Sequence, residues 1–157
     1  MINQRSCIGT VSYMGGIPAL PEPFVWSWTQ LIQFNRESLC QPNEYIHYTR
    51  ARISLHSAAR TEIASQTKGD WLFMLDCDMT FDPDILARLL RLMHHYNVEI
   101  VSGIYPYKSA PCFPVASTWN ETIQRHEGIA DWPESADLFE VSSIGAGCLL
   151  IRKRVLE

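Results

Sequence analysis

The sequence predicts an α/β domain in which helices flank a mostly parallel central sheet. Strand-like segments alternate with segments of helical periodicity through most of the chain, an order typical of parallel sheets. The run Trp71–Leu75 is wholly apolar and is bounded by turn residues, as expected for a strand buried on both faces. The later part of the chain is richer in β character, which predicts a smaller antiparallel portion.

Before the central run, strand and helix signals alternate. The expected elements are a strand over residues 7–12, a helix over 24–39, a strand over 44–49 and a helix over 53–66. Both helices carry apolar residues at helical spacing. A loop begins at Tyr13, because the prolines that follow interrupt regular structure. The second helix should close near Lys68-Gly69, since a cation and a glycine favour a helix end.

The best-marked helix follows the central run. Asp82 is its expected N-cap, Pro83 its first helical residue and Asp84 an acid in its first turn. Its apolar stripe extends from Ile85 to Met93. The remaining expected segments are a strand over 98–102, a proline-rich loop over 105–114, a strand over 115–119, a polar turn region over 131–137, strands over 141–144 and 148–151, and a helix at the chain end.

Length and composition bound the class of protein. The 157 residues fit one domain spanning 1–157. A net charge of −4 gives no electrostatic attraction to nucleic acid or to an anionic membrane. No segment reaches the roughly 18 apolar residues of a membrane helix, and the first residues lack a signal-peptide pattern. The five cysteines form no C-x-x-C pair, which argues against disulfides and structural zinc. We therefore expect a cytoplasmic protein without an integral membrane segment.

The sequence Asp76-Cys77-Asp78 carries the clearest chemical signal. Residues two apart in a strand point the same way, so both carboxylates can converge at the sheet edge where α/β proteins bind ligands. Two close carboxylates repel each other unless a cation lies between them, and oxygen ligands suit Mg²⁺ or Mn²⁺. The alternative is that the two aspartates only shape the turn after the strand.

Two further functions remain open at this point. Residues 76–80 also match the D-x-D-x-T motif of haloacid-dehalogenase-type phosphatases, in which the first Asp attacks phosphorus and the second acts as acid and base. Those enzymes carry the motif near the chain start and a paired acidic motif later, and this chain has neither; Lys108 is the one tolerable lysine. A nucleotide-binding module without turnover is the third possibility.

Several motifs together resemble a known family. Arg60 on a helix, the Gly69-Asp70 pair, the apolar strand and the D-x-D of residues 76–78 are similar to the core of GT-A-fold glycosyltransferases, in particular family 2-like enzymes. Phe81–Leu86 and Gly145–Arg154 resemble the family's later segments. The resemblance implies a GT-A fold, which is Rossmann-like. It also implies sugar transfer from a UDP- or GDP-linked donor to an unknown acceptor, assisted by Mn²⁺ or Mg²⁺.

The resemblance also implies roles for single residues. Asp78 would bind the metal that bridges the donor diphosphate, Asp76 would reach the ribose or the metal through water, and Arg60 would lie near the nucleotide. The loop from Tyr13 would lie beside the base, because it follows the first strand at the same edge. The residues expected around the donor are Asp76, Asp78, Arg60, Tyr13, Arg52, Tyr105 and Lys108, with Asp76 and Asp78 as the metal ligands.

Some positions depart from the family pattern. Thr61 stands where the family usually has asparagine, and Ile63 where a glycine is frequent. The family's catalytic base lies beyond the glycine turn at Gly145, and this chain ends at Glu157. We therefore expect a domain truncated on the acceptor side, or an acid supplied by residues 131–140. No catalytic base is assigned from the sequence.

Overall fold

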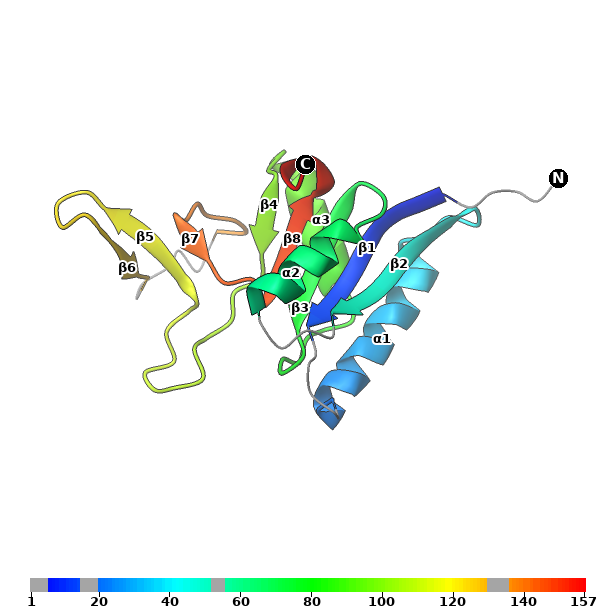
Figure 1. Ribbon diagram of the computed structural model, residues 1–157, viewed down its shortest axis with the longest axis horizontal. Coiled ribbons are helices and arrows are strands. Elements are labelled where there is room, and N and C mark those ends of the chain that lie inside the picture. Colours follow the sequence, from blue (N-terminus) through cyan, green and yellow to red (C-terminus); the bar gives the residue numbers. More distant parts are fainter. Residues whose placement is uncertain (1–5, 15–19, 52–55, 130–135) are drawn as a thin grey trace.

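The computed structural model describes residues 6–14, 20–51, 56–129 and 136–157 (Figure 1). The elements in chain order are β1 Ser6–Met14, α1 Glu22–Ser38, β2 Glu44–Ala51, α2 His56–Ser65, β3 Trp71–Asp76, α3 Ile85–His95, β4 Ile100–Ser102, β5 Ala116–Asn120, β6 Arg125–Gly128, β7 Ser143–Ile144, β8 Cys148–Arg152 and the 3₁₀ helix η1 Lys153–Val155. The strands form a five-stranded sheet, ordered β2-β1-β3-β8-β4, and a three-stranded sheet, ordered β6-β5-β7.

The five-stranded sheet is mostly parallel. β1 pairs with β2 and β3 in parallel, whereas β8 is antiparallel to both β3 and β4. Every strand of this sheet except β8 therefore runs in one direction. The three-stranded sheet is antiparallel throughout. These arrangements confirm the predicted α/β class, with a mostly parallel sheet and a smaller antiparallel portion late in the chain.

Helices cover both faces of the five-stranded sheet. α1 and α3 pack on one face, where Phe24 and Leu86 meet Phe73 of β3. α2 packs on the other face, where Ile63 meets Leu72 (Figure 1). Because neighbouring residues of a strand point to opposite faces, β3 contributes to both layers, and each residue of Trp71–Leu75 is buried. This double burial is the physical reason for an apolar run without alternation.

A glycine turn delivers the chain into β3. Gly69 has a φ of 78°, and a Cβ there would lie 2.3 Å from the backbone nitrogen of Gly9. Only glycine fits such a close approach in the left-handed region. The side chain of Thr10 stabilises the same turn, since its hydroxyl donates to the Lys68 carbonyl at 3.0 Å and accepts from the Lys68 amide at 2.7 Å.

Several element boundaries differ from the prediction. α3 begins at Ile85 with Asp84 at the N-cap, so the assignment of Asp82 as N-cap was wrong. The Asp82 carboxylate instead binds Arg88 at 2.9 Å, and the Asp82 carbonyl accepts from the Ile85 amide at 3.2 Å. Pro83 therefore lies in a turn before the helix. The chain end forms the short η1 and not an α-helix. Among the described residues, no helix is both long and apolar enough to cross a bilayer.

The three-stranded sheet forms an arm that projects from the rest of the protein (Figure 1). No residue of β5, β6 or β7 is buried. β6 was not predicted from the sequence. The segment between β4 and β5 is closed by a bridge between Pro106 and Pro114 and by a 2.8 Å hydrogen bond from the Tyr107 amide to the Phe113 carbonyl.

Candidate functional site

The carboxyl ends of three parallel strands meet at one sheet edge. Met14, near the end of β1, lies in register with Ala51 at the end of β2 and with Asp76 at the end of β3. Ligands of open α/β sheets bind outside this kind of edge. The Asp76-Cys77-Asp78 motif therefore lies where the topology favours a binding site.

The two aspartates lie on either side of a strand end. β3 finishes at Asp76, and the Met79 amide approaches the Asp76 carbonyl at 3.4 Å, so Cys77 and Asp78 belong to a turn. The alternation of side chains in a strand therefore does not govern the direction of Asp78. Asp76 is half-buried, whereas the Asp78 side chain is 44 % exposed.

Lys108 forms an ion pair with Asp78. Its ammonium donates a hydrogen bond to Asp78 Oδ2 from the segment that follows β4. The pKa of Lys108 is raised above its ordinary value, chiefly by this hydrogen bond and by the charge of Asp78, with a smaller contribution from Asp76. The structure thus brings Lys108 into contact with Asp78, at the edge where the sequence predicted it.

Tyr105 connects the glycine turn before β8 to Asp76. The Gly147 amide donates to Tyr105 Oη at 2.8 Å, and the Asp76 amide donates to the Gly147 carbonyl at 2.9 Å. A Cβ on Gly147 would lie 2.9 Å from both Asp76 Oδ2 and Tyr105 Cζ, and one on Gly145 would lie 2.0 Å from Tyr105 Oη. The two glycines therefore leave the space that the phenol occupies beside the carboxylate.

Arg60 approaches the same cluster from α2. The pKa of Tyr105 is raised mainly by burial; the nearby charge of Asp76 adds to this effect, and the Arg60 charge opposes it. The Nε of Arg60 is buried and has no hydrogen-bond partner in the described part of the chain. An unsatisfied buried donor of this kind is costly, which favours a ligand oxygen as its partner.

Tyr13 lies in a strand, and Arg52 and most of the predicted loop lie outside the described residues. Tyr13 lies inside β1 and not at the start of a loop, so that boundary was wrong. Its ring is buried against Phe24, at a centroid distance of 5.3 Å, and Trp28, at 4.9 Å. The role of Tyr13 beside a base stays a prediction. Arg52, residues 15–18 of the predicted loop and residues 131–135 lie outside the described residues.

Asp76 and Asp78 are the carboxylates at this edge that could hold a metal ion. The described residues contain no group of three or more His, Cys, Asp or Glu side chains able to hold a metal by themselves. Mg²⁺ commonly keeps several waters and binds one or two carboxylates together with substrate phosphates. Asp76 and Asp78 match this mode of binding, and the Lys108 ammonium beside Asp78 indicates that the position favours positive charge.

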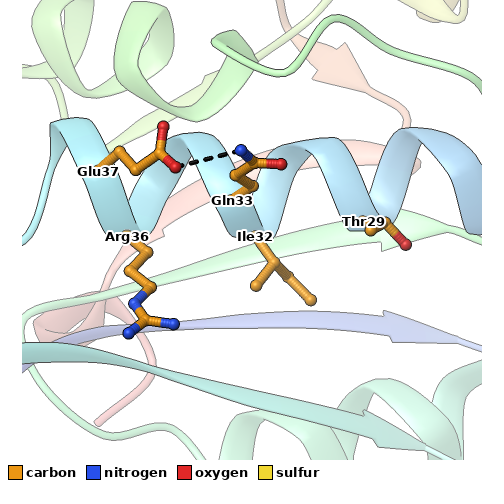
Figure 2. A pocket seen from close by; sticks show the side chains of 5 residues that line it. All are labelled: Thr29, Ile32, Gln33, Arg36 and Glu37. Atoms are coloured by element: carbon orange, nitrogen blue, oxygen red, sulfur yellow. Dashed lines mark hydrogen bonds between the residues drawn. The ribbon is translucent and has the colours of Figure 1, made fainter.

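Two surface hollows lie on α1, away from this sheet edge. A hollow of about 590 Å³ is lined by Thr29, Ile32, Gln33, Arg36 and Glu37 of α1 (Figure 2). A second of about 370 Å³ lies near the start of the same helix. Neither contains a predicted site residue. We place the candidate site at the sheet edge, because the carboxylates and cations converge there and not on α1.

The contact between the glycine turn and Tyr105 was not predicted from the sequence. The Gly145-Ala146-Gly147 spacing was visible in the sequence, but its partner Tyr105 lies 42 residues before Gly147. The signal that could have found it is the pair of glycines at the start of an apolar strand, because such glycines mark close approach of another group.

Comparison with known families identifies the chain. Residues 32–157 match the family described as Glycosyl transferase family 2, a match that includes β3, the aspartate motif, Lys108 and the glycine turn. A search of curated proteins found no match to the chain. The match covers most of the sequence, and the mixed sheet with its flanking helices is consistent with the GT-A fold. The chain therefore belongs to glycosyl transferase family 2.

Proposed function

We propose that this glycosyltransferase domain takes its sugar from a nucleoside-diphosphate donor, held at the carboxyl edge of the five-stranded sheet with a divalent cation on Asp78 and Asp76. Family membership supports the glycosyltransferase activity itself. The observation that carries the proposal for donor and cation is the ion pair of Lys108 with Asp78, which lies two residues after Asp76 at the end of β3.

The chemistry of such a donor explains the mixture of charges. When a sugar leaves a nucleoside diphosphate, negative charge grows on the diphosphate oxygens. A Mn²⁺ or Mg²⁺ ion supplies Lewis-acid stabilisation of that charge. Asp78 and Asp76 would hold this ion. Lys108 and Arg60 would offer N–H donors to oxygens that the ion does not reach.

The ion pair of Lys108 with Asp78 gives an order of events. Asp78 Oδ2 accepts a hydrogen bond from Lys108, so a cation held by Asp78 would compete with the ammonium for that oxygen. The Lys108 side chain is 77 % exposed and therefore free to turn toward a phosphate. In this proposal Lys108 exchanges one anionic partner for another as the donor binds.

Tyr105 has a positioning role in this scheme. Its phenol accepts from the Gly147 amide, and the Gly147 carbonyl in turn accepts from the Asp76 amide. Burial raises the pKa of Tyr105, so the phenol stays neutral at physiological pH. Tyr105 therefore fixes the backbone of Asp76, and no proton transfer is assigned to it.

Calorimetry with UDP and GDP, each with and without Mn²⁺, tests the proposal. We expect Mn²⁺-dependent binding of one nucleotide, weakened about tenfold or more in Asp78→Ala, since loss of one charge-assisted contact of about 1.4 kcal/mol has this effect. Asp82→Ala is the matched control, because Asp82 is an exposed aspartate that pairs with Arg88 instead. Absence of binding by either nucleotide would refute the proposed donor site.

The two alternatives have their own readouts. A phosphatase using Asp76 as nucleophile would release phosphate from p-nitrophenyl phosphate, and we expect no release. A module without turnover would bind the nucleotide without consuming a sugar donor. We expect release of free sugar from at least one member of a panel of UDP- and GDP-sugars. Nucleotide binding with no turnover of any donor would favour the inert module.

A further inference from the structure

One face of the arm gathers an indole, an imidazole and two hydroxyl groups. Trp119 of β5 pairs with His126 of β6, with ring centroids 5.1 Å apart. Ser117 lies two residues before Trp119 and so on the same face, and its Oγ is 3.2 Å from His126 Nδ1. Ser143 of β7 pairs with Ser117. We call the surface made by Ser117, Trp119, His126, Gly128 and Ser143 the aromatic face.

The aromatic face is open beside the indole. Gly128 pairs with Ser117, and a Cβ at Gly128 would meet no atom within 4 Å. The Trp119 side chain is 40 % exposed, and Ser143 and His126 are exposed as well. A ligand can therefore lie flat beside the ring with polar groups at its margin.

The charged groups of the hairpin lie on its other face. Arg125 and Glu127 flank His126 in the sequence and point the opposite way, because side chains alternate along a strand. Glu127 accepts a hydrogen bond from Asn120 on that other face at 2.8 Å. Among the described residues of β5, β6 and β7, the aromatic face therefore carries no Lys, Arg, Asp or Glu side chain, which disfavours a phosphate or a charged peptide as its ligand.

The arm begins at the candidate donor site. The Val115 amide donates to the Tyr105 carbonyl and the Gly145 amide to the Val115 carbonyl, each at 2.9 Å. Tyr105 is the residue whose phenol lies beside Asp76. Trp119 follows Val115 by four residues of extended chain, about 13 Å along the strand. A ligand that reaches the reacting end of the donor can thus extend onto the aromatic face.

We propose that the aromatic face binds a neutral saccharide unit of the acceptor, an inference that rests on the proposed function. A pyranose ring has an apolar C–H face that suits an indole, and hydroxyls at its edge that suit groups able to donate and accept. Trp119 provides the first surface, and Ser117, Ser143 and His126 provide the second. The acceptor is then a carbohydrate chain that runs along the arm.

Titration of the protein with cellotetraose, chitotetraose and maltotetraose, followed by NMR, tests the inference. We expect at least one to bind, with about tenfold weaker affinity in Trp119→Ala, the effect of losing about 1.4 kcal/mol of aromatic contact. Trp26→Ala is the matched control, because Trp26 is an even more exposed indole, at 68 %, on α1. We expect this control to bind the saccharide with unchanged affinity.

Gly128→Val provides a second test that leaves the indole intact. A Cβ at Gly128 would meet no atom within 4 Å, so the variant should fold and yet block the open part of the face. We expect weaker saccharide binding in this variant too. Binding unchanged in both Trp119→Ala and Gly128→Val, or no binding of any of the three saccharides to the unmodified protein, would overturn the inference.

Nucleotide binding by the same protein samples distinguishes failure of this inference from failure of the proposed function. Calorimetry with UDP, GDP and Mn²⁺ reports on the donor site alone. Intact nucleotide binding without saccharide binding refutes the aromatic face as an acceptor site and leaves the donor site standing. Saccharide binding without nucleotide binding supports the face as a carbohydrate site but contradicts the donor proposal.

Discussion

The five-stranded sheet and the arm are stabilised in different ways. In β3 and β8 every residue except the last is buried, whereas β5, β6 and β7 contain no buried residue. The first sheet packs against helices on both faces. The arm is held by its strand pairing and by the hydrogen bonds of Val115 with Tyr105 and Gly145.

Because of this difference, the five-stranded sheet provides the stability of the protein, whereas the arm provides exposed chemical groups. Burial of apolar area is the main favourable contribution to folding, so the five-stranded sheet and its helices carry most of the free energy of folding. A small sheet without a packed face contributes little by itself. The arm can instead present polar and aromatic groups to a ligand. Three measurements, described from the largest expected effect to the smallest, test this division.

Truncation of a core residue should have the largest effect. Phe73 is fully buried between β3 and the helices α1 and α3, so Phe73→Ala should lower the free energy of unfolding by about 3–5 kcal/mol. Thr118→Ala on the exposed arm should change it by less than about 0.5 kcal/mol. Urea denaturation measures both. Similar losses for the two variants would contradict the division.

Alkaline pH should weaken the five-stranded sheet through Cys148. Burial raises the pKa of this thiol from 9.0 to about 11. Above pH 9 the unfolded chain releases this proton and the folded chain keeps it, so stability is full below pH 9 and falls as pH rises to 11. The expected loss is about 2–3 kcal/mol. Urea denaturation at pH 8, 9.5 and 11, under reducing conditions, measures it.

Two cysteine variants test whether Cys148 causes this loss of stability at alkaline pH. Cys148→Ala should make the decline between pH 9 and 11 shallower, because the thiol with the pKa of about 11 is gone. Cys112→Ala is the control, since Cys112 is an exposed thiol in the segment that leads to the arm, and its profile should match that of the unmodified protein. An equally steep decline in Cys148→Ala would assign the effect to other groups.

The smallest expected change in stability comes from substituting one glycine in each sheet. A Cβ at Gly9 in β1 would lie 2.2 Å from the Trp71 ring, whereas one at Gly128 in β6 would meet nothing within 4 Å. Gly9→Ala should cost about 1–3 kcal/mol through overpacking. Gly128→Ala should be neutral, or stabilising by up to about 1 kcal/mol, because alanine restricts the unfolded chain. Thermal unfolding of both variants shows whether Gly9→Ala lowers the stability while Gly128→Ala leaves it unchanged or raises it.

The same division explains which elements were predictable. β3 was found because its burial on both faces requires an apolar run. β6 was missed because Arg125–Gly128 contains no apolar residue and therefore no pattern. The N-cap of α3 was misplaced because Asp82 and Asp84 are both acceptable N-cap residues, and Arg88 pairs with each of them in the structure.

The site was predictable to the extent that topology determines it. Asp76 ends β3, and Tyr105 and Lys108 follow β4, which runs in the same direction, so all three lie at one edge of the sheet. Contacts between side chains distant in sequence were not predictable. The hydrogen bond between Gly147 and Tyr105 depends on the antiparallel insertion of β8 between β3 and β4, which no local pattern encodes.

The absence of buried residues in the arm has a consequence for how the protein can change. Substitutions on β5 and β6 alter a surface without disturbing packing, so many sequences there are compatible with the same fold. Around Asp76, in contrast, the glycine turn leaves no room for a methyl group. Under the proposed acceptor role, selection or engineering for a different acceptor has most freedom in the arm and can act there without disturbing the five-stranded sheet.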